Sequence, residues 1–261
     1  SGNAVVLRGG KESLHSNAAI ARIVRQAVQA QGVDPNIVQL VGTADRAAVG
    51  ALLRQVGKID LAIPRGGESL IRAVVEQAHI PVIKHYAGNC HVYVDAAAAA
   101  LGEGMARDIC VNAKVQRPGV CNAAETLLFH ADAAPIQVDT CRALAAAGVE
   151  LRVCECSRNL LTGHVADAQL VDATEDDWHT EYLDLICAIK VVDSVDEAIA
   201  HINRYGSQHT DAVLSANVNV CDRFVQQVDS ADVMVNCSTR FSDGGEYGLG
   251  AEIGISTDKL H

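Results

Sequence analysis

An alternation of apolar runs and helical patterns, with a turn at each junction, constrains the fold of this chain more than any other feature. Four short apolar runs typical of buried strands are separated by stretches in which apolar residues recur three and four positions apart. The runs are 4–8, 37–41, 59–63 and 80–85, and the helical stretches are 16–28, 45–56 and 69–78. This order predicts an α/β fold with a doubly wound parallel sheet. In such sheets ligands usually bind beyond the carboxyl ends of the strands.

The same kinds of pattern continue to the end of the chain. Further strands are expected at 91–95, 125–129, 149–154, 180–192, 211–216 and 231–237, and helices at 96–113, 136–147, 194–206 and 219–229. We expect residues 1–95 to form one domain and residues 96–261 to form a second α/β domain.

Composition excludes several classes of function. Hydrophobic residues make up 49% of the chain and aromatic residues only 3%, and the formal net charge is -11. Neither a basic stripe for nucleic acid nor a basic amphipathic helix for a membrane surface is present. Neither a signal peptide nor an apolar run of about 18 residues is found, so we expect a soluble, cytoplasmic protein. The nine scattered cysteines predict reduced thiols, and the absence of an initiator Met leads us to expect a piece of a longer protein.

Two glycine turns follow predicted strands and are candidates for binding an anion. Lys11 follows Gly9-Gly10 in the first turn, and its cation could reach a phosphate or a ribose. In the second turn, 64–69, main-chain N–H groups at the start of a helix could face an anion. Neither turn has a standard nucleotide-binding motif, and an ordinary surface role for each remains open.

Cys121 is the candidate nucleophile, because it lies on a loop between a helix and a strand where the two domains meet. Arg117, four residues earlier, could lower the pKa of the thiol if the loop folds back. Composition alone favours the alternative, a buried structural cysteine. The pair Cys154 and Cys156 lacks the further ligands of a closed zinc site, so no metal is predicted. His85 and other dispersed histidines could line a pocket or serve the core.

The stretch 236–257 contains too many polar residues and glycines to be a core segment. Its Arg240 and the glycines that follow, including Gly248 and Gly250, are typical of a clamp for an anionic substrate. A surface loop without a ligand remains the alternative.

Several of these stretches resemble, in the same order along the chain, the gamma-glutamyl phosphate reductase family of the aldehyde dehydrogenase superfamily. The resemblance runs from residue 1 to residue 261 and is carried by SGNAVVLRGGKES, IDLAIPRGGESLIRAVVE, CHVYVD, NAKVQRPGVCNAAETLL, EAIAHINRYGSQHTDAV and VDSADVMVNCSTRFSDGGEYGLGAEIGIST. It implies NADPH-dependent reduction of L-glutamyl 5-phosphate to L-glutamate 5-semialdehyde, the second step of proline biosynthesis. It also implies a homo-oligomer that acts on a small molecule.

The resemblance implies roles for particular residues. Cys121 is the implied nucleophile that carries a thioester, and Glu181 is the implied ligand of the nicotinamide ribose, although the family's usual Phe-Gly-Pro does not follow it. The residues implied to bind the cofactor in the first domain are Lys11, Arg65, Gly66 and Gly67. We expect Arg117 to steer the phosphate group, and Arg240 with the 248–254 loop to hold the α-carboxylate.

One position departs from the family. Lys84 falls near the place where oxidising aldehyde dehydrogenases carry a carboxylate that activates water, and where this family more often has an acid. A lysine there suits a reductase, because hydrolysis would waste the thioester, and a purely structural lysine remains the ordinary alternative. Two other functions stay open: an oxidative dehydrogenase of a small acidic aldehyde, and a non-catalytic part of the fold.

Overall fold

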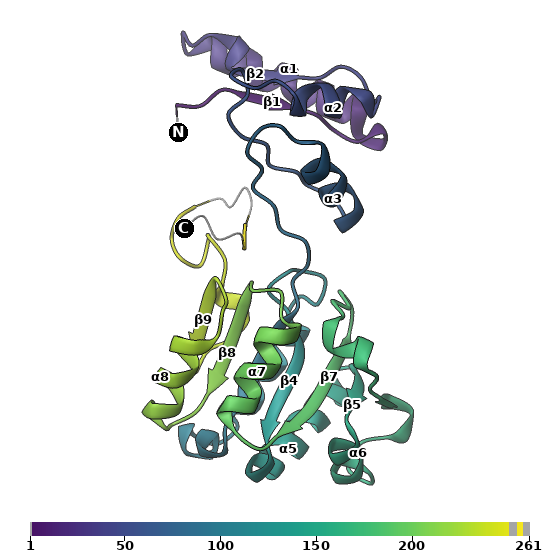
Figure 1. Cartoon of the computed structure of the whole chain (residues 1–261), viewed down its shortest axis with the longest axis vertical. Coiled ribbons are helices and arrows are strands. Elements are labelled where there is room, and N and C mark those ends of the chain that lie inside the picture. Colours follow the sequence, from purple (N-terminus) through teal and green to yellow (C-terminus); the bar gives the residue numbers. More distant parts are fainter. Residues whose placement is uncertain (1, 251–254, 258–261) are drawn as a thin grey trace. The chain divides into compact units, whose positions relative to one another are not determined.

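The structure is a computed structural model that describes residues 2–250 and 255–257. The chain divides into two compact units, residues 1–84 and 85–261 (Figure 1). The strand β3, Cys90–Val94, lies in the second unit, where it pairs with β4 and β8. The boundary therefore falls before this strand and not after residue 95, because pairing with the later strands ties β3 to them.

The first unit contains a two-stranded parallel sheet with a helical crossover. Its elements are β1 (Val5–Leu7), η1 (Lys11–Ser13), α1 (Leu14–Ala30), η2 (Pro35–Ile37), β2 (Val38–Leu40), α2 (Ala47–Leu53) and α3 (Glu68–Gln77). The strands predicted at 59–63 and 80–85 are absent. These two segments share only an isolated bridge between Ala62 and Val82, because an apolar run becomes a strand only where a neighbour accepts its backbone hydrogen bonds.

The second unit is built on a sheet of seven strands, all parallel, in the order β6-β5-β7-β4-β3-β8-β9. The strands other than β3 are β4 (Ala124–His130), β5 (Glu150–Val153), β6 (Leu170–Asp172), β7 (Ile186–Val192), β8 (Thr210–Leu214) and β9 (Asp232–Val235). The parallel sheet confirms the predicted α/β class. The central strands β3, β4 and β8 are almost wholly buried, as expected for strands covered on both faces.

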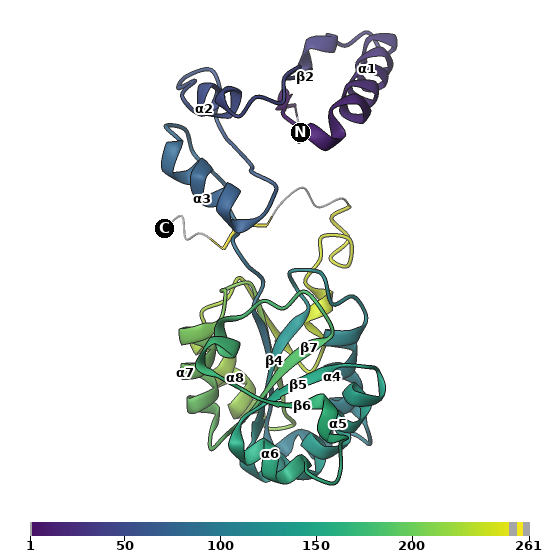
Figure 2. The same ribbon diagram turned by 90° about the vertical axis from the view of Figure 1, so that its right-hand side faces the viewer.

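Alternate residues of the central strands point into two separate cores. Val92 and Leu127 belong to the core that contains residues of α4 and α5, whereas Tyr93 and Leu128 belong to the core that contains residues of α7 and α8. Figure 2 shows these helix pairs on opposite sides of the strands. The helices are η3 (Ala96–Leu101), α4 (Met105–Val115), η4 (Ala131–Ala133), α5 (Ala134–Ala146), α6 (Glu155–Leu161), η5 (Asp167–Gln169), η6 (Glu175–His179), α7 (Val195–Tyr205), α8 (Val218–Gln227) and η7 (Thr239–Phe241).

Two predicted elements are interrupted by left-handed backbone. The helix expected at 96–113 is split into η3 and α4 by Gly102 and Gly104, which have φ of 131° and 73°. The strand region expected at 180–192 begins only at Ile186, and Leu183 before it has φ of 56°. Over the described residues, none of the helices has the length and apolarity needed to cross a bilayer.

Candidate active site at the amino ends of the sheet

Three segments that are far apart in the sequence meet at one edge of the large sheet. His85, Cys121 and His209 precede the strands β3, β4 and β8, which are neighbours in the sheet. Parallel strands all begin at the same edge, the upper edge of this sheet in Figure 1, so the residues just before them are brought together. The cluster thus lies at the amino ends of these strands, opposite to the edge that the general rule for doubly wound sheets predicts.

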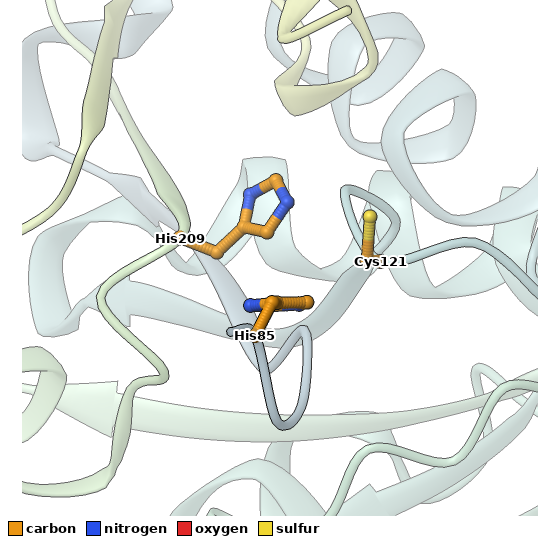
Figure 3. A group of neighbouring side chains, drawn as sticks. All are labelled: His85, Cys121 and His209. Carbon is orange, nitrogen blue, oxygen red and sulfur yellow. The ribbon is translucent and has the colours of Figure 1, made fainter. Parts of the chain in front are cut away.

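The three side chains form a compact group (Figure 3). One donor atom from each, a ring nitrogen or the sulfur, lies within 4.8 Å of the other two. The rings of His85 and His209 meet edge to face with centroids 4.9 Å apart. His209 is 1% exposed, while His85 and Cys121 are half-buried. A half-buried thiol beside two imidazoles is accessible to a small molecule and has proton acceptors within reach.

The backbone of Cys121 is contacted by residues at the start of β3 and just before it. The thiol of Cys90 donates a hydrogen bond to the carbonyl oxygen of Cys121, with Sγ and O 3.2 Å apart. Gly88 packs against the same residue so closely that a Cβ there would lie within 2.6 Å of the O, Cα and C atoms of Cys121. Only glycine permits this approach of two backbones, so the position of the thiol depends on Gly88.

We expect Gly88→Ala in the full-length protein to lower kcat by about 10²-fold, because displacing a nucleophile by about 1 Å costs roughly that much. Gly119→Ala is the matched control in the same loop, since its Cβ would meet only the Leu183 carbonyl at an ordinary 3.5 Å. Steady-state kinetics of both variants give the comparison. Equal rates for the two variants would show that the approach of Gly88 does not set the position of Cys121.

Glu181 reaches this site from the loop before β7. Its Oε1 accepts a hydrogen bond from the N–H of Gly88 at 2.8 Å, and Gly88 is the residue that supports Cys121. The loop is supported in turn by a buried ion pair between Lys114 and Glu125, with Nζ and Oε2 2.5 Å apart. The other oxygen of Glu125 accepts a hydrogen bond from the N–H of Leu183 at 3.4 Å. Burial raises the pKa of Glu125 to about 7, against the opposing effect of the Lys114 cation.

Most of the other thiols differ from Cys121 in their surroundings. Burial raises the pKa of six of them: Cys90, Cys110, Cys141, Cys187, Cys221 and Cys237. A raised pKa keeps a thiol protonated and unreactive at neutral pH. Among the described residues none of the nine cysteines is in a disulfide, as the sequence predicts.

The predicted substrate-binding residues lie on two segments that meet near the end of α4. Arg117 is exposed in the loop that leads to Cys121. The Nε of Arg240 donates to the side-chain oxygen of Gln116 at 3.2 Å, which places the two arginines on neighbouring segments. The buried Asn122 donates to the carbonyl oxygen of Ser242 at 2.8 Å and anchors the Arg240 segment beside the Cys121 loop.

The glycines that the sequence places in the same clamp have the backbone that glycine favours. Gly248 and Gly250 are exposed, with φ of 73° and 85°. Part of the predicted 248–254 loop, residues 251–254, lies outside the described residues.

The predicted cofactor-binding residues of the first unit are at two exposed turns. Lys11 begins η1 after β1, and Arg65 to Gly67 precede α3. All four of these residues are exposed. Lys84 is half-buried and is the last residue of the first unit.

His209 is the member of the cluster that the sequence does not single out. It lies between a helix end and a strand, 88 positions from Cys121, in the stretch EAIAHINRYGSQHTDAV that carries part of the resemblance but assigns it no role. Its Nδ1 is 2.7 Å from the Thr210 hydroxyl. Burial lowers the pKa of His209 to about 4, with a further effect from His85, so the ring is neutral at pH 7. Two signals could have found it: the stretch of family resemblance that contains it, and the predicted topology, because residues just before neighbouring parallel strands share one edge.

Comparisons with known proteins show what the chain is similar to. No family model matches the chain. The gamma-glutamyl phosphate reductase of Geotalea daltonii is 53% identical over 261 residues, which are all of this chain and 60% of that protein. Over its whole length the chain is therefore similar to a gamma-glutamyl phosphate reductase. It spans about 60% of the length of this curated relative.

Solved structures agree with this placement. The crystal structure of the gamma-glutamyl phosphate reductase of Thermotoga maritima matches all of this chain and 61% of its own, with a TM-score of 0.93 and 45% identity. An engineered glycolyl-CoA reductase with bound NADP+ matches 98% of this chain and 63% of its own, with a TM-score of 0.70 and 19% identity, and so shares the fold. These comparisons confirm the resemblance stated from the sequence, and the shared architecture confirms the predicted fold class.

Proposed function

We propose that the protein to which this chain belongs reduces L-glutamyl 5-phosphate to L-glutamate 5-semialdehyde and phosphate with NADPH, through a thioester on Cys121. The observation that carries the proposal is the half-buried thiol of Cys121 in a group with two imidazoles at the sheet edge, in a chain 53% identical to a gamma-glutamyl phosphate reductase. The geometry supports a nucleophile, and the relatives supply the substrate class.

The covalent chemistry needs little beyond this thiol. The Cys121 thiolate attacks the acyl carbonyl, the S–C bond forms, the C–O bond to phosphate breaks, and phosphate leaves. The N–H of Cys121 is our candidate to stabilise the oxyanion, and one such donor is typically worth about 3 kcal/mol. Bound NADPH supplies the hydride that reduces the thioester. When the S–C bond then breaks, the aldehyde is released and the sulfur returns as a thiolate or a thiol.

The residues of the first unit fit the phosphates of a dinucleotide. Lys11 presents a cation after the carboxyl end of β1. The helix α3 follows the Gly66-Gly67 turn, and Gly67 has no side chain to cap the first N–H groups of the helix. Uncapped N–H groups at a helix start bind phosphate. We propose Lys11, Arg65, Gly66 and Gly67 for this role, with Glu181 in the second unit for the ribose.

Arg117 and Arg240 are our candidates for the two anionic groups of the substrate. Both lie on the segments next to Cys121, and an arginine can hold a carboxylate or a phosphate with two parallel hydrogen bonds. We further propose that the protein is cytoplasmic and forms a homo-oligomer, as the family resemblance implies.

Arg240→Lys tests the clamp. A lysine keeps the charge but loses the fork of donors, so we expect the KM for the substrate to rise about tenfold while kcat changes little. Arg204→Lys, at an exposed surface pair with Glu175, is the matched control and should leave KM unchanged. An unaltered KM in Arg240→Lys would remove this residue from the substrate site.

The reverse reaction tests the function as a whole. Full-length protein is incubated with L-glutamate 5-semialdehyde and NADP+, with and without phosphate, and the formation of NADPH is followed. We expect NADPH to form only when phosphate is present, because phosphate is needed to cleave the thioester. NADPH formation that needs no phosphate and yields glutamate would identify an oxidative dehydrogenase. The absence of reaction under both conditions would indicate a non-catalytic protein.

A further inference from the structure

The group of His85, Cys121 and His209 has the composition of a transition-metal site. It offers two imidazole nitrogens and one sulfur, with the three donor atoms within 4.8 Å of one another. In a tetrahedral zinc site, Zn–S of ~2.3 Å and Zn–N of ~2.0 Å place neighbouring donors ~3.3–3.6 Å apart. The donors therefore need to approach by about 1 Å, which rotation of the half-buried His85 and Cys121 side chains can provide.

His209 is already arranged as a metal ligand. Its Nδ1 is hydrogen-bonded to the Thr210 hydroxyl at 2.7 Å. Its Nε2 is buried and has no hydrogen-bond partner among the described residues. Only 1% of the residue is exposed. In Figure 3 one ring nitrogen of His209 lies on the side of Cys121. Metal-binding histidines characteristically have the second nitrogen fixed by a hydrogen bond, which leaves the first with its lone pair toward the ion.

We propose that His85, Cys121 and His209 bind Zn²⁺, and that the bound ion reversibly blocks the thiol. Two nitrogens and a thiolate suit Zn²⁺ better than Mg²⁺ or Ca²⁺, which prefer oxygen ligands. Three protein ligands leave the fourth position for water. Zinc bound to the sulfur occupies the electron pair that attacks the substrate, so the metal and the acyl group compete for one atom. The inhibitory effect rests on the proposed function, whereas the binding of the metal does not.

Cobalt(II) provides the test of binding, because its spectrum reports the ligands directly. Full-length protein is freed of metal with EDTA and titrated with Co²⁺. We expect the intense visible bands of a four-coordinate site and a sulfur-to-cobalt charge-transfer band in the near ultraviolet, both abolished by excess Zn²⁺. Cys121→Ser should lose the charge-transfer band, while Cys156→Ser, at an exposed thiol, should keep it. A band that survives in Cys121→Ser would overturn the proposal.

The histidines are tested by affinity. We expect His209→Gln and His85→Gln each to weaken Zn²⁺ binding at least tenfold, measured by competition against Co²⁺. His15→Gln, at an exposed histidine of α1, should leave the affinity unchanged. If the buried His209 variant fails to fold, which circular dichroism shows, the half-buried His85 variant decides. Wild-type affinity in a folded variant of either histidine would refute the site.

The rate of reduction separates this proposal from the proposed function. We expect micromolar free Zn²⁺ to reduce the rate at least tenfold, with full recovery after EDTA and less inhibition at higher acyl substrate. An active enzyme that shows no cobalt band refutes only the metal site. A protein that binds cobalt through Cys121 but has no reductase activity refutes only the function. An active enzyme that binds Zn²⁺ through Cys121 without inhibition refutes the block of the thiol.

Discussion

Cys121→Ser in the full-length protein is expected to lower the rate of NADPH-dependent reduction by roughly 10³-fold or more, the scale on which enzymes lose rate when their nucleophile is removed. A serine hydroxyl stays protonated at neutral pH and attacks an acyl phosphate poorly, whereas cysteine sulfur is intrinsically a much stronger nucleophile. The backbone at position 121 should keep its place, because the contacts of Gly88 and the hydrogen bond from Cys90 are made to backbone atoms of this residue. The loss should therefore appear in kcat, with the thermal unfolding midpoint close to that of the wild type.

Two further measurements show that the sulfur itself is responsible. Cys156→Ser, the exposed cysteine, should retain the native rate. Alkylation followed by mass spectrometry should show Cys121 reacting much faster than the six thiols whose pKa is raised by burial, and NADPH should alter that rate. Native turnover by Cys121→Ser would mean that the acyl group is carried elsewhere or not carried at all.

In the second unit, the local pattern of apolar and polar residues is enough to predict most helices and strands. The run at 211–216 is mainly apolar, and most of it lies in β8, Thr210–Leu214, whose five residues are all buried. The amphipathic stretch at 194–206 likewise forms α7 over Val195–Tyr205, with Ser194 capping its start. In the first unit, the equally apolar runs at 59–63 and 80–85 form only one bridge. Strand formation there depends on a partner, which periodicity cannot supply.

The site could be predicted only in part for the same reason. Cys121 stands out by its motif and Glu181 is implied by a looser match, but their relation through Gly88 depends on three loops meeting at one edge. The three loops meet because β3 lies between β4 and β8 in the sheet. The contact between β3 and β8 joins residues far apart in the sequence: the N–H of His91 donates to the side chain of Asp211, 120 positions away. Nothing local encodes this order. The sequence therefore assigns no role to His209, although this residue lies in a stretch that carries the family resemblance and precedes a correctly predicted strand.

Removing one partner of the buried ion pair behind the site is expected to destabilise the second unit strongly. Lys114 and Glu125 are both 0% exposed, and they join α4 to β4 just before and after the Cys121 loop. We expect Lys114→Met to lower the free energy of unfolding by about 3–5 kcal/mol, because it leaves a buried carboxylate without its cation. Lys114→Met/Glu125→Leu should recover most of that loss, since two apolar side chains leave no charge uncompensated. Urea denaturation of the full-length protein measures both.

The pH dependence of the single variant provides the second readout. Burial raises the pKa of Glu125 above its ordinary value of 4.5 even when Lys114 opposes the effect, and removal of the cation raises it further. A carboxyl group with a higher pKa in the folded protein than in the unfolded chain binds its proton more tightly when folded. The free energy of unfolding therefore falls as the pH rises from the carboxyl pKa of the unfolded chain to that of the folded protein. Lys114→Met should thus be closest to the wild type near pH 5 and least stable above pH 7. Arg204→Met, which breaks the exposed pair with Glu175, should change stability little at any pH. A Lys114→Met protein as stable as this control at pH 8 would show that Glu125 gains no stabilisation from Lys114.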